Sequence, residues 1–267
     1  MTPTTLMPTR RYKPLGVCMY CLQAAEKLTE EHIFPEAIGG KWKLPASVCA
    51  NCQTIVNKPE ALVLQGDLYT ARLALEIRRK KHAKKERRDG PALPRKIATS
   101  NGPFGQQFPE PDYQPAAGEL SPLITLLQFL PPSRLPGLAR DESQHAVKLS
   151  MIHLGKGSPW PVGTHLSTKE PMHPWEYAYS IAKWGYAFAV AERGLECCDS
   201  SAIRDLLLGH GDDPMSFAGG IEEPLQRGTH LHWAALREEG GLLVARLHLF
   251  ASAGARPYDV VVGRLMR

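Results

Sequence analysis

The sequence predicts an α+β fold that joins a small cysteine-bearing N-terminal unit to a C-terminal unit of helix and antiparallel strands. Three observations lead to this prediction. Two C-x2-C pairs, CMYC and CANC, lie near the N-terminus. Apolar side chains recur at helical spacing in WEYAYSIAKWGYAFAVAERG. Further on, the alternating runs THLHWAAL and LLVARLHLF flank REEGG, which is typical of a β-hairpin.

Length and composition bound the possibilities. The chain has 267 residues and a formal net charge of +5, so it can bury one large core or two small ones. No apolar run approaches the ~20 residues that a membrane-spanning helix needs. The first residues, MTPTTLMPTRRYKPL, contain no apolar stretch long enough for a secretory signal. We therefore expect a cytoplasmic protein that has no membrane partner.

Composition divides the chain into four parts. Residues 1–15 are rich in Pro and Thr and are expected to be a disordered tail. Residues 16–88 carry the cysteine pairs and a helix that we expect to restart at Pro59, since proline suits a first helical turn. Residues 89–144 are punctuated by Pro and Gly and predict a connector, within which LSPLITLLQFL is apolar enough to dock on a core. Residues 145–267 are the predicted C-terminal α+β domain.

The elements of the C-terminal domain follow from local pattern. HAVKLSMIHLG predicts a strand, and the long helix begins after Pro174. SSAIRDLLLG predicts a short helix that ends at Gly209, and PYDVVVG predicts a third strand after the hairpin. His230 and His232 alternate in the hairpin and so share a face. We expect them to be structural, because no third metal ligand accompanies them.

The two C-x2-C pairs, Cys18–Cys21 and Cys49–Cys52, predict a metal site. Each pair makes a tight turn that directs both sulfurs to one point, and two such turns complete a tetrahedral shell of four thiolates that suits Zn²⁺. Four unrelated buried thiols are one alternative, and iron–sulfur ligation is another. A four-thiolate shell has no open position for substrate, so this zinc would be structural. His32, which lies between the pairs, is then free for another role.

The order C-x2-C, LTEEHIFPEAIGG and VCANC before a helix resembles the zinc-ribbon branch of the HNH (ββα-metal) endonucleases. The resemblance covers about a quarter of the chain. It implies a zinc-stapled ββα unit in which Glu31 holds a catalytic Mg²⁺ or other divalent cation and His32 is the general base. It also implies that Gly39 and Gly40 form the turn between the two strands.

Phosphodiester hydrolysis explains why such residue types are needed. A histidine with an ordinary pKa of ~6.5 can take a proton from water near neutral pH. A hard cation that neutralises the phosphate prefers oxygen ligands. The sequence leaves the ligand set open in two ways. Gln53 stands where the family has Asn or His, and Asn57 lies on the same helical face, so either could be the third ligand. Glu30 shares a strand face with His32 and competes with Glu31 for the role of acid.

The run RRKKHAKKERR at residues 78–88 is a candidate nucleic-acid contact. Its position directly after the nuclease helix favours sequence-independent binding to phosphates. The alternative is a solvated helix end, where cations are also favoured. The candidate binding residues are Arg78, Arg79, Lys80, Lys81, Lys84, Lys85, Arg87 and Arg88.

Two functional hypotheses remain open at this point. The first is a metal-dependent endonuclease that cuts nucleic acid, with DNA as the first expectation. The second is a catalytically inactive zinc-ribbon module that binds nucleic acid or a partner protein. Gln53 is the feature of the sequence that favours the second hypothesis.

Overall fold

The structure is a computed structural model that describes residues 7–68, 71, 97–99, 123–137, 147–153, 164–166, 172–211, 213–221 and 228–266. The predicted basic run at residues 78–88 lies outside this part of the chain, as do the predicted domain boundaries near residues 88 and 144. No helix in the described part of the chain is long and apolar enough to cross a membrane.

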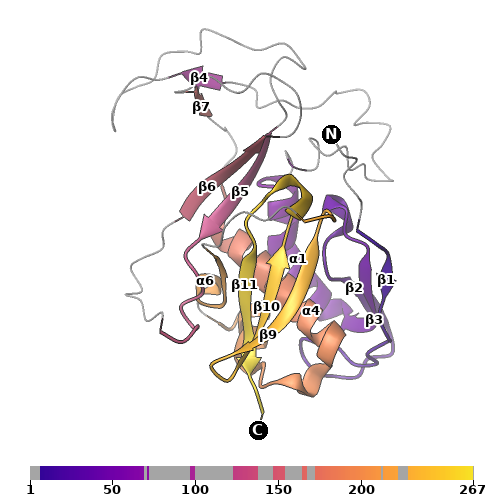
Figure 1. Cartoon of the computed structure of the whole chain (residues 1–267). Helices are drawn as coiled ribbons and strands as arrows, with labels where there is room; N and C mark the ends of the chain where they lie inside the picture. Colours follow the sequence, from indigo (N-terminus) through magenta and orange to yellow (C-terminus); the bar gives the residue numbers. More distant parts are fainter. Residues whose placement is uncertain are drawn as a thin grey trace, which may run out of the picture.

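The N-terminal unit has the expected order of two strands and a helix (Figure 1). Strand β2 (Leu28–His32) pairs antiparallel with β3 (Trp42–Cys49), and a short 3₁₀ turn, η1 (Glu36–Ile38), lies between them. A third strand, β1 (Arg10–Arg11), runs parallel to β3, which gives the sheet order β1-β3-β2. Helix α1 (Ala50–Gln65) follows β3 directly.

Residues 7–15 do not form the loose tail that we expected. β1 pairs with β3, and Met7 is 1% exposed because it packs into the core. Backbone hydrogen bonds from Tyr12 to Lys43 and from Leu15 to Pro45 continue the contact beyond β1. Pairing with an open strand edge thus outweighs the local Pro- and Thr-rich composition.

Helix α1 also differs from the expectation, because it passes through Pro59 instead of restarting there. Proline inside a helix removes one backbone hydrogen bond, here the one to the carbonyl of Ile55. Ile55 is exposed, so water can satisfy that carbonyl. Val56 and Val63, on either side of the proline, are fully buried. Their packing holds the two halves of the helix in line.

The C-terminal part consists of a long helix and a four-stranded antiparallel sheet. Helix α4 (Pro174–Arg193) begins at the predicted proline. The sheet has the order β8-β11-β10-β9. Its strands are β8 (Ala218–Gly220), β9 (Trp233–Glu239), β10 (Leu242–His248) and β11 (Tyr258–Arg264). The shorter helical elements are η2 (Leu195–Cys197), α5 (Ser201–Leu207), α6 (Pro214–Phe217) and η3 (Ala251–Ala253). The helix, hairpin and third strand predicted from the pattern are therefore present.

The β9–β10 hairpin turns at Gly240 and Gly241, whose φ angles are 56° and 78°. Two consecutive residues with positive φ match a two-residue hairpin turn, which glycine adopts without strain.

The predicted connector contains a strand that belongs to the core. Strand β5 (Leu123–Phe129) pairs antiparallel with β6 (Val147–His153), and a second short pair joins β4 (Ile97–Thr99) to β7 (Thr164–Leu166). Four apolar side chains of β5 are buried, namely Ile124, Leu126, Leu127 and Phe129. LSPLITLLQFL thus docks as expected, but it does so as one strand of a β-ribbon.

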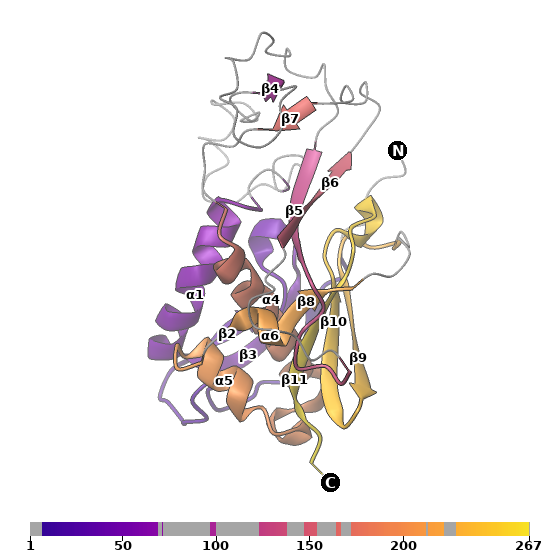
Figure 2. The same cartoon turned by 90° about the vertical axis from the view of Figure 1, so that its left-hand side faces the viewer.

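Helix α4 lies between α1 and the four-stranded sheet (Figure 2). Gly185 allows the close approach of α4 to β11, since a Cβ atom there would meet Val260 Cβ at 2.6 Å. One hydrophobic cluster includes Val56 and Val63 of α1, Ile181 of α4 and Val260 of β11. The helix and sheet that we expected to form a separate domain therefore share a core with the N-terminal unit.

Candidate functional site

Four cysteine sulfurs come together where the loop before β2 meets the end of β3 and the first turn of α1. The Sγ atoms of Cys18, Cys21, Cys49 and Cys52 all lie within 4.8 Å of one another, and no disulfide joins them. The Sγ atoms of Cys21 and Cys49 are 3.9 Å apart. This convergence of four thiols fits one tetrahedral zinc ion, as the spacing predicted.

Local backbone structure explains the convergence. The Leu22 N–H donates to the carbonyl of Cys18, and Leu22 has a φ of 61°, so the first pair sits in a tight turn. The second pair spans the start of α1. There the backbone N–H of Cys52 lowers the pKa of Cys49 to about 7, which favours the thiolate that a metal requires.

The glycine turn also lies where the sequence predicts it, between β2 and β3. Gly39 has a φ of 90° and ends η1. A Cβ atom on Gly40 would meet the carbonyl oxygen of Phe34 at 1.9 Å, so only glycine fits there.

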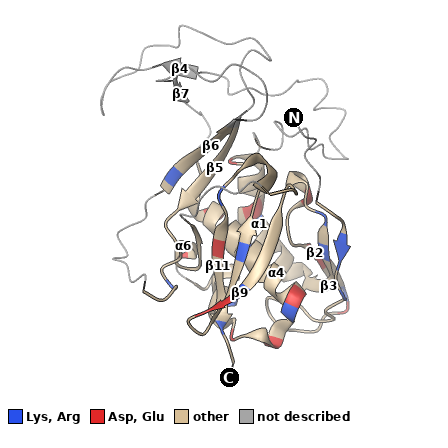
Figure 3. Cartoon of the chain, in the orientation of Figure 1, with Lys and Arg blue, Asp and Glu red and all other residues tan. Residues whose placement is uncertain are grey.

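Strand β2 directs its last three side chains to two different faces. Glu30 and His32 lie on the outer face, and Glu31 lies on the inner face against α1 and α4. On the outer face, Glu30 accepts from Lys43 Nζ at 2.6 Å and from Arg11 Nη1 at 2.9 Å. These contacts lower the pKa of Glu30, mainly through Lys43. Arg11 belongs to β1, which consists of two arginines at the edge of the sheet (Figure 3).

The His32 side chain is 27% exposed, and its Nε2 lies 3.6 Å from Glu30 Oε1. Its Nδ1 is buried and has no hydrogen-bond partner among the residues that the structure describes. Burial lowers the pKa of His32, and the charge of Lys43 lowers it further. The imidazole is therefore neutral near pH 7 and able to accept a proton.

Glu31 on the inner face is 5% exposed and bound to a lysine from the C-terminal part of the chain. Its Oε1 lies 3.0 Å from Nζ of Lys183, a residue of α4 that is only 1% exposed. The same ammonium lies 3.0 Å from Glu60 Oε2 and donates to Asn57 Oδ1 at 3.0 Å. Trp184 Nε1 donates to the other oxygen of Glu60 at 2.6 Å. Two carboxylates and one amide oxygen thus surround a single buried ammonium.

The carboxylates and the ammonium in this cluster each favour the charged form of the other. Burial raises the pKa of Glu31, and the charge of Lys183 opposes that rise. Burial lowers the pKa of Lys183, but the carboxylates of Glu31 and Glu60 more than offset it, so this pKa lies above its ordinary value. The lysine is therefore charged throughout the physiological pH range.

The predicted magnesium ligands, Glu31, Gln53 and Asn57, do not form a free oxygen set in this arrangement. Glu31 and Asn57 both hold the ammonium of Lys183. Gln53 lies half-buried in the first turn of α1, on the same helical face as Asn57. As placed here, these residues do not fit a magnesium ion, because a second cation would lie next to a buried ammonium.

Lys183 and Glu60 are the two residues of the cluster that pattern analysis missed. A signal for Lys183 was present in the sequence, because it is the single charge within the apolar run YSIAKWGYAFAV. A lysine in the middle of a buried helix requires a partner of opposite charge. Glu60 follows Asn57 by three positions and so extends the same face of α1.

His232 lies just before β9, outside the hairpin strand where we expected it, but it has the structural role that we predicted. It is buried, and its Nδ1 accepts a hydrogen bond from the Phe250 N–H at 3.1 Å. Its Nε2 therefore carries the proton and donates to the Ile38 carbonyl at 2.7 Å. Burial lowers the pKa of His232 to about 4, so it remains neutral. This hydrogen bond connects the segment just before β9 to the 3₁₀ turn η1, which follows His32.

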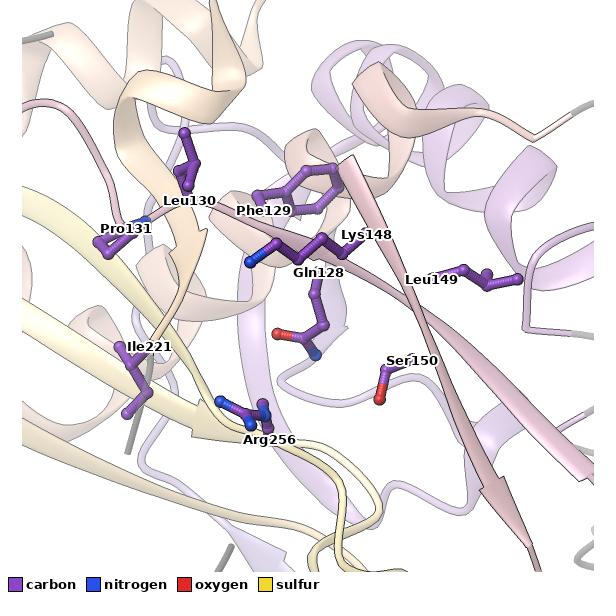
Figure 4. A pocket seen from close by; sticks show the side chains of 9 residues that line it. All are labelled: Gln128, Phe129, Leu130, Pro131, Lys148, Leu149, Ser150, Ile221 and Arg256. Atoms are coloured by element: carbon purple, nitrogen blue, oxygen red, sulfur yellow. The ribbon is translucent and has the colours of Figure 1, made fainter. Parts of the chain in front are cut away.

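A cavity of about 250 Å³ lies away from residues 18–59, between the β5–β6 ribbon and the C-terminal sheet (Figure 4). Its polar lining includes Lys148, Arg256, Gln128 and Ser150, and none of the residues lining it is acidic. This lining does not suit a metal cation.

Comparison with known proteins bears on the N-terminal unit. A family model described as HNH endonuclease matches residues 18–59, which include the four cysteines, β2, β3 and most of α1. No curated protein and no solved structure matches the chain.

Proposed function

Because residues 18–59 form an HNH endonuclease domain, we propose that this protein hydrolyses phosphodiester bonds in nucleic acid with His32 as the general base. The observation that carries the proposal is the position of His32 at the end of β2. There its imidazole is partly exposed and its pKa is lowered, so it is uncharged at neutral pH.

In the proposed reaction the neutral imidazole of His32 takes a proton from a water molecule. The water oxygen attacks phosphorus, the bond from phosphorus to the leaving oxygen breaks, and a proton from solvent neutralises that oxygen. Glu30 is placed to stabilise the imidazolium, since its Oε1 lies 3.6 Å from Nε2. Arg11 and Lys43 add positive charge to the same face, which favours a phosphate there.

Zinc and magnesium, the two metals that the family resemblance implies, have different roles in this proposal. Four thiolates fit a zinc ion that would fasten the start of α1 to the loop before β2, and zinc takes no part in the reaction. No step is assigned to magnesium, because Glu31 and Asn57 bind Lys183.

A second candidate function is favoured by that same lysine. A domain whose acid is bound to a buried ammonium can bind nucleic acid or a partner protein without cleaving anything. Gln53 supports this candidate too, because it replaces the Asn or His expected at the start of the helix.

A plasmid-nicking assay distinguishes the two candidates. Wild type is compared with His32→Ala in chelator and in Mg²⁺, Mn²⁺ and Ni²⁺, and DNA binding is measured in parallel. If His32 is the base, the variant loses roughly 10²–10⁴ in cleavage rate with little change in binding. His210→Ala is the matched control, because His210 is an exposed histidine. DNA binding by a wild-type protein that nicks under none of these conditions would favour the second candidate.

A further inference from the structure

We propose that Lys183 is a built-in replacement for a divalent cation, held by Glu31, Asn57 and Glu60 in a site that therefore binds no metal in the native chain. This inference concerns metal binding and holds whether or not the protein cleaves nucleic acid.

The contact geometry is the first support. A lysine ammonium carries three N–H donors and no acceptor. Nζ of Lys183 lies 3.0 Å from one oxygen of each of Glu31, Glu60 and Asn57, so every N–H has one oxygen partner. The side chains come from three elements, β2, α1 and α4, which gives the ammonium a fixed position.

Ligand chemistry is the second support. Carboxylate and amide oxygens are the donors that hard divalent cations prefer. With both acids ionised, Glu31 and Glu60 carry two negative charges against the single positive charge of Lys183. A divalent cation in its place would balance both carboxylates. The oxygen set therefore suits a divalent cation, and it is the lysine that excludes one.

The attachment of α4 to its neighbours is the third support, because it makes the ammonium a fixed part of the site and not a mobile gate. Tyr186 donates to the Met19 carbonyl, and Tyr179, two turns earlier in α4, donates to the Leu207 carbonyl. Gly185 packs against Val260 so closely that a Cβ atom would clash. The backbone at Lys183 is therefore fixed in the core, and the Lys183 side chain, which is 1% exposed, extends from that point to its three oxygen partners.

Removing the charge tests the proposal directly. Lys183→Met keeps most of the side-chain length but leaves the oxygens without a cation. The probe is Mn²⁺, added to zinc-loaded protein and followed by electron paramagnetic resonance. We expect Lys183→Met to bind Mn²⁺ at least about 10-fold more tightly than wild type, since a positive charge no longer repels the ion. Lys183→Met/Glu31→Gln should lose this gain.

Lys27→Met is the matched control, because Lys27 is an exposed lysine outside this cluster. It should leave Mn²⁺ binding as in wild type. Mn²⁺ should also raise the melting temperature of Lys183→Met more than that of wild type, since the ion binds only the folded state. A folded Lys183→Met that binds Mn²⁺ no better than wild type would overturn the proposal.

If Lys183→Met does not fold, wild type and Glu31→Gln decide the question. Glutamine can still accept a hydrogen bond from Lys183, so this change is mild. We expect the same Mn²⁺ isotherm for both proteins, and a wild-type site that Glu31→Gln abolishes would contradict the replacement. Neither measurement depends on cleavage, so failure of the proposed nuclease activity would leave this result intact.

Discussion

Glu31 and His32 are neighbours in the chain, yet their side chains lie on opposite faces of β2. Glu31 contacts Lys183 in the core, and His32 lies beside Glu30 at the surface. Strand geometry makes this separation unavoidable, because successive side chains point to opposite faces. A proton acceptor at His32 and a cation held by Glu31 would therefore act from different sides of the strand.

The zinc prediction is the most direct to test. Metal analysis of purified protein should give about one zinc per chain, since four thiolates fill one tetrahedral shell. Cys18→Ser combined with Cys49→Ser should lose the metal and destabilise the fold. Cys197→Ser is the control, because Cys197 lies outside the cluster. Zinc that survives the double substitution would contradict the assignment.

The titration of His32 should depend on Lys43. Burial and the charge of Lys43 both lower the pKa of His32, so the proton-accepting form should persist to a pH below the ordinary ~6.5. Lys43→Met removes a positive charge and should move the pKa of His32 upward, which shifts the acidic limb of any cleavage profile to higher pH. NMR titration of the His32 ring measures this without relying on activity. An unchanged or lower pKa in the variant would contradict the electrostatic assignment.

Lys183 should contribute far more to stability than a surface lysine. Lys183→Ala leaves the buried Glu31 and the partly buried Glu60 without their cation, and breaking a buried ion pair in this way costs about 3–5 kcal/mol. Lys43→Ala removes a partly exposed ion pair and should cost roughly 0–1 kcal/mol. Urea denaturation measures both free energies of unfolding. Equal losses for the two variants would mean that the buried cluster is not what holds α4 to α1.

The basic run is expected to hold nucleic acid through its phosphates. Replacing Arg78, Arg79, Lys80 and Lys81 with Gln should weaken DNA binding for all sequences and flatten its salt dependence, because fewer counterions are released. Binding curves at several salt concentrations measure this. An unchanged salt slope would indicate that the run is only a solvated segment.

Short-range pattern was enough to predict several parts of the molecule. The spacing of the four cysteines predicted their convergence, because each pair forms its own tight turn. Alternation predicted β9, β10 and β11, and helical periodicity predicted α4. In each case the signal lies within one element or between neighbouring elements.

The features that pattern analysis missed depend on contacts between distant residues. Lys183 and Asn57 are 126 positions apart, so nothing local relates one to the other. The continuation of α1 through Pro59 depends on the burial of Val56 and Val63. Arg10 and Arg11 form strand β1 because they pair with the open edge of β3, although the sequence around them does not favour a strand.

The close packing of α4 against α1 limits how the HNH domain could be exchanged between proteins. A fragment that stops before α4 would expose Val56 and Val63 and would leave Glu31 and Glu60 without their cation. Zinc would hold the ends of the ββα unit together, but that unit would lack the surface that shields its inner face. A functional transfer of this unit into another chain would therefore have to include α4, or a helix with a lysine at the same position.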